Sequence, residues 1–128
     1  MTGLRRQYHF RNSERGVLAW DVHTLIELAG KEPVTEVDVS TIPEIDENWW
    51  YAHGQTPTVR SIVEHLRLID GVDLDWPVIL DPDGRLMDGM HRVARALREG
   101  RSTLTVRRLS VLPKPTFIGV APEDLPYE

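Results

Sequence analysis

The sequence predicts an α+β domain in which two or three helices pack against one small mixed β-sheet. Apolar side chains recur at helical spacing over residues 56–71 and 90–100. Between these segments, residues 76–89 contain a short apolar run, a tight turn and a second extended run. The length of 128 residues corresponds to one domain, for which we expect a core at about residues 34–109. The proline-rich tail, residues 110–128, is expected to lie extended, on the surface or on a partner.

The first half of the chain predicts one helix, one strand and one loop. Asp21 is a suitable N-cap for a short helix that ends at Gly30 and Pro33. Its apolar face consists of Val22, Leu25, Ile26 and Ala29. Residues 34–45 alternate apolar and polar side chains, which predicts a strand that leads into an acidic turn. The aromatic segment that follows reads as a loop.

The second half predicts the elements that carry the functional motif. Thr56 is expected to cap the helix that ends at Gly71, with Pro57 in its first turn. Its expected core face consists of Val59, Ile62, Val63, Leu66 and Ile69. The next helix is expected to turn Met90, Val93, Ala94 and Leu97 toward the core. Gly100 ends that helix, and a last strand contains Leu104, Val106 and Leu109.

Composition limits the class of protein. The chain has no cysteine, which excludes disulfides, thiolate zinc sites and a cysteine nucleophile. The basic, polar start resembles no signal peptide, and no apolar run reaches membrane-spanning length. We therefore expect a cytoplasmic protein with no membrane partner.

Charge is distributed unevenly along the chain. The net charge of −5 disfavours a general nucleic-acid binder. Residues 85–108, however, contain seven arginines and two acidic residues. Arginine binds phosphate or carboxylate through two parallel hydrogen bonds. The segment therefore suits a phosphate ligand or a docking face.

Residues 88–92, Asp-Gly-Met-His-Arg, open the second confident helix. A helix start offers unpaired amides and positive potential, and glycine lets an anion approach the backbone closely. Arg92 lies in the first turn, and His91 can donate a hydrogen bond or move a proton near neutral pH. Asp88 is expected at the N-cap, where its carboxylate would oppose a second anion. The alternative is a capped helix start with solvated His91 and Arg92.

Residues 79–100, followed by 103–109, resemble the ParB/sulfiredoxin-like fold. Its members carry a strand, a Gly-Arg turn, a short strand and then Asp-Gly-x-His-Arg at the start of a helix. The resemblance covers roughly residues 34–109, and residues 20–33 resemble the N-terminus of small bacterial ParB-like proteins. It implies that this turn binds the phosphate of a nucleoside triphosphate or diphosphate, through Gly89, Met90, His91 and Arg92.

The resemblance includes several activities. Sulfiredoxins need a cysteine before the His-Arg pair, where this chain has Met90, so we do not expect that activity. Partition proteins use CTP and a downstream helix-turn-helix domain, for which the chain leaves no room. Other members resemble free-serine kinases or show nuclease or nucleotidase behaviour. We therefore expect nucleotide binding, with phosphoryl transfer or nucleotide hydrolysis as the possible reaction.

The remaining candidates are the acidic turn and the aromatic loop. Glu44 and Glu47 are candidate bases, or with Asp88 could position Mg²⁺, although a solvated acidic loop is the alternative. The adjacent Trp49 and Trp50 could stack on a base or grip a partner. The histidines at 9, 23 and 65 are interpreted as surface or helix-face residues, and His53 has no metal-ligand partner at standard spacing.

A second hypothesis is a non-enzymatic module. Such a protein would bind DNA or a protein partner through its arginines, or a protein through its tail. The arginines in question are Arg95, Arg98, Arg101, Arg107 and Arg108. The last two are expected on opposite sides of a strand, which splits the patch.

Overall fold

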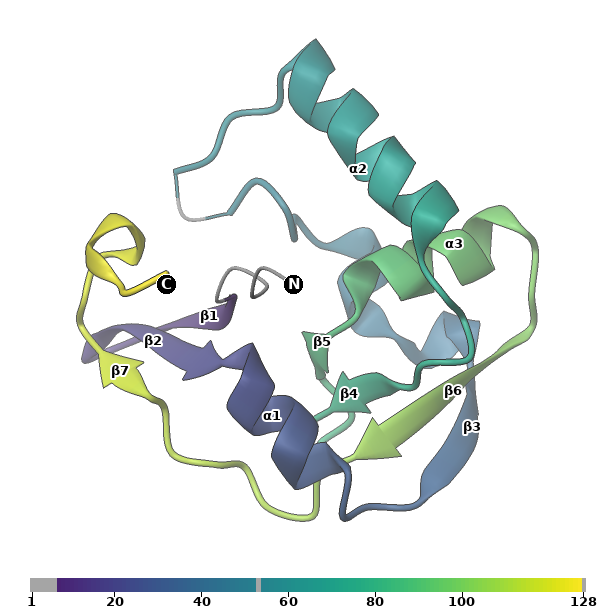
Figure 1. Cartoon of the computed structure of the whole chain (residues 1–128), viewed down its shortest axis with the longest axis horizontal. Helices are drawn as coiled ribbons and strands as arrows, with labels where there is room; N and C mark the ends of the chain where they lie inside the picture. Colours follow the sequence, from purple (N-terminus) through teal and green to yellow (C-terminus); the bar gives the residue numbers. More distant parts are fainter. Residues whose placement is uncertain (1–6, 53, 128) are drawn as a thin grey trace, which may run out of the picture.

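Two β-sheets and three α-helices make up the part of the chain that the computed structural model describes, residues 7–52 and 54–127 (Figure 1). The antiparallel sheet has the order β1-β2-β7, with strands at Tyr8–Ser13, Gly16–Asp21 and Phe117–Ile118. The mixed sheet has the order β3-β6-β4-β5, with strands at Val34–Asp38, Thr103–Arg108, Val78–Leu80 and Leu86–Asp88. The predicted α+β class is confirmed, but the single sheet becomes two.

The β1–β2 hairpin was not predicted, because half-exposed polar side chains occupy much of β1. Its second strand pairs with β7 from the tail, with Ala19 opposite Phe117. Trp20 Nε1 also donates a hydrogen bond to the carbonyl oxygen of Pro113, at 2.8 Å. The tail therefore packs against the N-terminal hairpin.

Strands β4 and β5 of the mixed sheet are largely buried, whereas most of β3 is exposed. This burial explains how two strands of only three residues persist. In β4, Val78 and Leu80 contact one hydrophobic cluster and Ile79 contacts the other, as strand alternation requires. Helix α3 (Met90–Arg98) covers the first face, and α1 (Val22–Ala29) covers the second. Burial on two faces explains why β4 reads as an unbroken apolar run.

Helix α1 begins as predicted, since the Asp21 side chain accepts a hydrogen bond from the His23 amide. Helix α3 is also present, and Gly100 has the expected positive φ of 69°. The core face of α3 differs from the prediction: Ala96 is buried, while Leu97 is exposed. This helix is therefore turned slightly about its axis relative to the predicted face.

Helix α2 (Val59–Gly71) differs most from the prediction. Thr58, not Thr56, is its N-cap, because Thr58 and Ser61 form a reciprocal capping box. Of the expected core face, only Ile69 is buried, and Val59, Ile62, Val63 and Leu66 are exposed. The helix packs against α3 and extends beyond it toward the top of the view (Figure 1).

The β4–β5 hairpin carries the chain to the start of α3. Its turn is held by Asp81, whose Oδ1 accepts hydrogen bonds from the Asp83 and Arg85 amides at 2.8 and 2.9 Å. Burial raises the pKa of Asp81, but these bonds and the Arg11 guanidinium lower it below its ordinary value. The predicted turn is confirmed and delivers Asp88 to the edge of the sheet.

Candidate functional site

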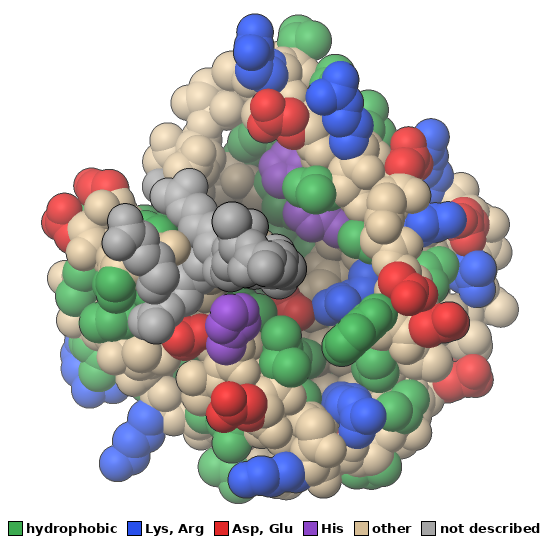
Figure 2. Space-filling view, viewed as in Figure 1, with side chains coloured by type: hydrophobic (Ala, Val, Ile, Leu, Met, Phe, Trp, Pro, Cys, Tyr) green, Lys and Arg blue, Asp and Glu red, His purple; other side chains and the backbone are tan. Residues whose placement is uncertain are grey.

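A pocket of about 1210 Å³ lies between the N-terminal hairpin and the β5–α3 turn. Its walls come from β1, the start of α1, residues 44–52 and residues 85–92. Figure 2 shows the molecule hollowed below α2, with histidine side chains on the wall. All the site residues predicted from the sequence line this pocket: Glu44, Glu47, Asp88, Gly89, Met90, His91 and Arg92. The structure therefore brings two segments far apart in the sequence to one place.

Gly89 is the N-cap of α3, and no side chain caps the helix. Its φ of 110° lies in the left-handed region that favours glycine. Asp88 was expected at this position, and that prediction is wrong, because its carboxylate turns toward Arg92. The Arg92 amide donates to the carbonyl oxygen of Gly89 at 3.0 Å, whereas the Met90 and His91 amides have no side-chain acceptor among the described residues.

Arg92 lies directly over Gly89. Its Nη2 donates to Asp88 Oδ2 at 3.0 Å, while its buried Nε has no hydrogen-bond partner among the described residues. A Cβ at position 89 would come within 2.8 Å of Arg92 Nη2 and 3.0 Å of Val78 Cγ2. Burial raises the pKa of Asp88, against the opposing effect of Arg92. The Arg92 guanidinium is thus held close to the start of α3, with its Nε hydrogen not donated to any described residue.

His91 belongs to a cluster of three rings, together with Trp50 and His65. The sequence indicated His91 and Trp50 as candidate site residues, but not His65. His91 Nε2 lies 2.8 Å from Nδ1 of His65, and Trp50 stacks on both imidazoles at centroid distances of 4.9 and 4.3 Å. Burial, followed by His65 and Arg92, lowers the pKa of His91 to about 4. His91 is therefore neutral at pH 7.

His65 was interpreted as a helix-face residue without a role. The missed signal is its spacing of four from Ser61 and from Ile69, which together define the inward face of α2. Burial lowers the pKa of His65, and Glu64 opposes that effect.

The two glutamates of the acidic turn share one arginine. Arg85 Nε lies 2.6 Å from Glu44 Oε2, and Arg85 Nη2 lies 3.0 Å from Glu47 Oε1. Glu44 is 1% exposed, and its Oε1 has no hydrogen-bond partner among the described residues. Glu47 is much more exposed. The alternative of a solvated acidic loop is therefore wrong at Glu44, which is buried.

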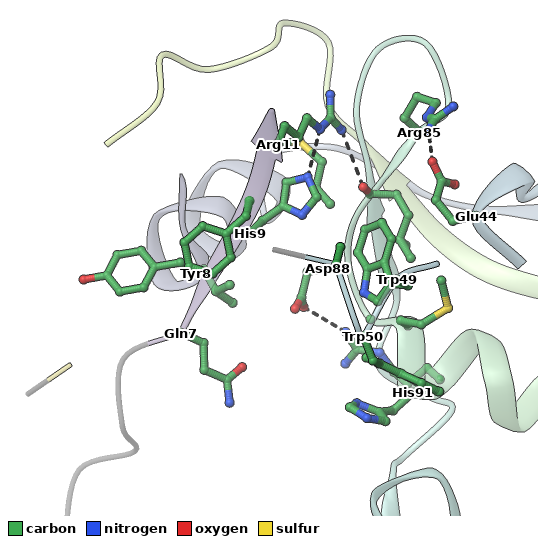
Figure 3. A pocket seen from close by; sticks show the side chains of 18 of the residues that line it. Gln7, Tyr8, His9, Arg11, Glu44, Trp49, Trp50, Arg85, Asp88 and His91 are labelled. Carbon is green, nitrogen blue, oxygen red and sulfur yellow. Dashed lines mark hydrogen bonds and ion pairs between the residues drawn. The ribbon is translucent and has the colours of Figure 1, made fainter. Parts of the chain in front are cut away.

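The opposite wall comes from β1 and was missed together with that strand. Arg11 Nε donates to His9 Nε2, and Arg11 Nη1 donates to Asp81 Oδ2, both at 2.9 Å. His9 is buried and stacks on Trp49. Figure 3 shows His9 and Arg11 across the pocket from Trp50 and His91. The pocket is therefore lined by aromatic rings as well as by ion pairs.

No group of three histidine, cysteine, aspartate or glutamate side chains among residues 7–52 and 54–127 is arranged to hold a metal ion. His53 lies outside the described residues. The three acids proposed for Mg²⁺ instead pair with arginines, so the side chains do not fit a metal site formed by the protein alone. Of the helices in the described parts of the chain, none is long and apolar enough to cross a membrane.

The other arginines of residues 95–108 bind nearby parts of the fold. Arg95 Nη1 donates to two carbonyl oxygens at the end of α2, and Arg98 pairs with Asp70. Arg101 pairs with Glu99, and Arg107 and Arg108 donate to the carbonyl oxygens of Glu32 and Pro82. These contacts fix the ends of helices and turns, which disfavours the reading of these arginines as a single docking face.

Comparisons of the chain with protein-family models, with curated proteins and with solved structures found no match. The fold and the site define an α+β protein with an uncapped helix start that opens on a pocket of balanced charge. Its function has to be argued from that pocket.

Proposed function

We propose that this chain is a ParB/sulfiredoxin-like domain that binds a nucleotide, with a phosphate at the turn formed by Gly89, Met90, His91 and Arg92. One observation carries the proposal: the start of α3 has no capping side chain among the described residues and opens on the pocket of about 1210 Å³. Helix amides and the helix dipole favour an anion at such a place. Arg92 adds a guanidinium with an unused, buried Nε donor.

The negative charge of Asp88 and its pairing with Arg92 oppose the binding of an anion at the start of α3. Asp88 already neutralises Arg92, and a carboxylate repels a phosphate. Burial raises the pKa of Asp88, so this carboxyl loses its charge more readily than an ordinary aspartate. A phosphate that approaches Arg92 favours the protonated form further, because like charges disfavour each other.

The rest of the pocket suits the remainder of a nucleotide. Tyr8, Trp49 and Tyr127 provide aromatic surface along its walls, on which a nucleobase can stack. Glu44 provides a buried carboxylate oxygen that has no hydrogen-bond partner among residues 7–52 and 54–127, which suits a ligand hydroxyl or amine as donor. Phosphoryl transfer or hydrolysis at this turn stays a prediction, with Glu44 and Glu47 as candidate bases.

A partner-binding module remains the second candidate. The observation that favours it is the exposed apolar stripe of α2. The arginine contacts described above weaken its DNA-binding version.

The experiment is thermal melting against ATP, ADP, CTP, GTP, AMP and inorganic phosphate, each with and without Mg²⁺. A ligand at about 100 times its dissociation constant stabilises a protein by roughly 2.7 kcal/mol, which for this size raises Tm by about 10 °C. Arg92→Gln is expected to lose the shift. Arg98→Gln, which alters an exposed arginine paired with Asp70, is the matched control and should keep it.

A shift that Arg92→Gln retains would place the ligand elsewhere. No shift with any of these ligands would remove nucleotide binding and favour the partner-binding module.

A further inference from the structure

Two imidazoles meet behind the start of α3, one from α2 and one from α3. His65 Nδ1 and His91 Nε2 lie 2.8 Å apart, and the ring planes differ by 22°. Trp50 lies nearly parallel to both rings and so covers them together. His91 lines the pocket and His65 does not. His65 therefore lies behind the pocket wall, in contact with His91 and Trp50, which both line the pocket.

This hydrogen bond determines where the protons are. A bond between two imidazole nitrogens needs one nitrogen that carries a hydrogen and one that does not. His91 is neutral at pH 7, so it carries a hydrogen on one ring nitrogen only. Its Nδ1 makes no hydrogen bond to the described residues. The choice of tautomer thus decides whether Nδ1 offers the pocket a donor or an acceptor.

We infer that His65 is a positioning residue, which donates its Nδ1 hydrogen to Nε2 of His91 and so fixes His91 as an Nδ1–H donor to an anionic oxygen in the pocket. The nature of the anion, a phosphate, rests on the proposed function. A neutral imidazole in the other tautomer would present a lone pair to that oxygen, which repels it.

The charges around the pair favour the same direction. Arg92 lies beside His91 and opposes its protonation, whereas Glu64 lies beside His65 and favours it. His65 is therefore the ring that accepts a proton first. Once charged, it carries hydrogens on both nitrogens and can only donate to His91. Partial protonation of the pair thus strengthens the arrangement that the inference requires.

The experiment is ¹⁵N NMR of the histidine rings at pH 7, combined with titration of inorganic phosphate and of ATP. Nitrogen shifts separate protonated from bare ring nitrogens, and the spectrum of His91→Gln assigns the His91 signals. His65→Phe keeps a ring under Trp50 but removes the donor. His65→Asn places an amide donor near the position of Nδ1. Leu68→Phe, at an exposed position of α2 that does not line the pocket, is the matched control.

In the unsubstituted protein we expect a protonated Nδ1 and a bare Nε2 on His91. His65→Phe should convert His91 to a mixture of tautomers and weaken phosphate binding by about tenfold or more. His65→Asn should restore both readouts in part, and Leu68→Phe should change neither. A merely structural role for His65 would not move the tautomer in this way.

A protonated Nε2 on His91, or a tautomer that His65→Phe leaves unchanged, would overturn the inference even if nucleotides bind. The expected tautomer in a protein that binds neither phosphate nor ATP would uphold the positioning of His91 and overturn the proposed function instead. The two failures are therefore distinguishable.

Discussion

Asp88 and Arg92 lie one helical turn apart and pair at 3.0 Å, so the acid that precedes α3 binds an arginine rather than the helix amides. This pair leaves Gly89 as the N-cap and the helix start without a capping side chain. It also neutralises the cation nearest to that start. The Asp88–Arg92 pair therefore leaves the start of α3 open to an anion. The Asp88 carboxylate also competes with that anion for Arg92.

Asp88→Asn is expected to tighten the binding of inorganic phosphate and of a nucleotide by about tenfold in Mg²⁺-free buffer at pH 7. The substitution removes the competing charge and leaves Arg92 for the ligand. Isothermal titration calorimetry gives the affinities. Asp70→Asn, which removes the partner of Arg98 on the surface, should leave them unchanged.

Weaker binding in Asp88→Asn would mean that the carboxylate itself contacts the ligand. A gain in both variants alike would trace the effect to the net charge of the protein rather than to Arg92.

Gly89→Ala is expected to lower the free energy of unfolding by about 2–4 kcal/mol. The positive φ alone costs of order 1 kcal/mol in alanine, and the Cβ also presses on Arg92 and Val78. Gly84→Ala is the matched control, because Gly84 has a similar positive φ with open space around it, and should cost only about 1 kcal/mol. Urea denaturation followed by circular dichroism measures both. Equal losses would show that Arg92 moves away without cost.

Much of the fold could be predicted from local signals. The Asp21 cap, the Asp81–Gly84 turn and the positive φ of Gly100 each act within a few residues, and the structure confirms them. The pairing of Ala19 with Phe117 joins opposite ends of the chain, and no local pattern indicates it. Strand β7 of the second sheet was missed for that reason, whereas the local β1–β2 hairpin was missed because of its polar side chains.

The residues of the site also divide into those that a local motif predicts and those that only tertiary packing brings together. Its residues on the β5–α3 turn were identified because a short motif contains them. Arg11 reaches the pocket, and His65 reaches the ring of His91 behind it, only through tertiary packing. For α2, the periodicity located the apolar stripe, but the tertiary contacts place Ser61, His65 and Ile69 inward instead.

Acid is expected to destabilise the protein through the two paired histidines. Burial lowers the pKa of His91 to about 4, while the unfolded chain has the ordinary value of 6.5. Between these values the unfolded state binds more protons, so the free energy of unfolding falls as the pH drops from 6.5 toward 4. His65 acts in the same direction. Asp88 opposes the trend near its own raised pKa, because its folded form takes up a proton first.

Urea midpoints at pH 7 and pH 5, followed by circular dichroism, measure this dependence. The double variant His65→Phe, His91→Phe should lose less stability between the two pH values than the unsubstituted protein. His23→Phe, an exposed histidine, should behave like the unsubstituted protein. An unaltered loss in the double variant would assign the acid sensitivity to other groups.

Isoleucine-to-alanine substitutions at a buried and at an exposed position of α2 are expected to lower the free energy of unfolding by different amounts. Ile69 is 7% exposed and Ile62 is 47% exposed. Ile69→Ala should lower the free energy of unfolding by about 2–4 kcal/mol, and Ile62→Ala by less than about 1 kcal/mol, since alanine also favours the helix. Urea denaturation of dilute protein measures both. A loss in Ile62→Ala as large as in Ile69→Ala would mean that the stripe is covered in solution, because only a buried isoleucine leaves a cavity when it is shortened.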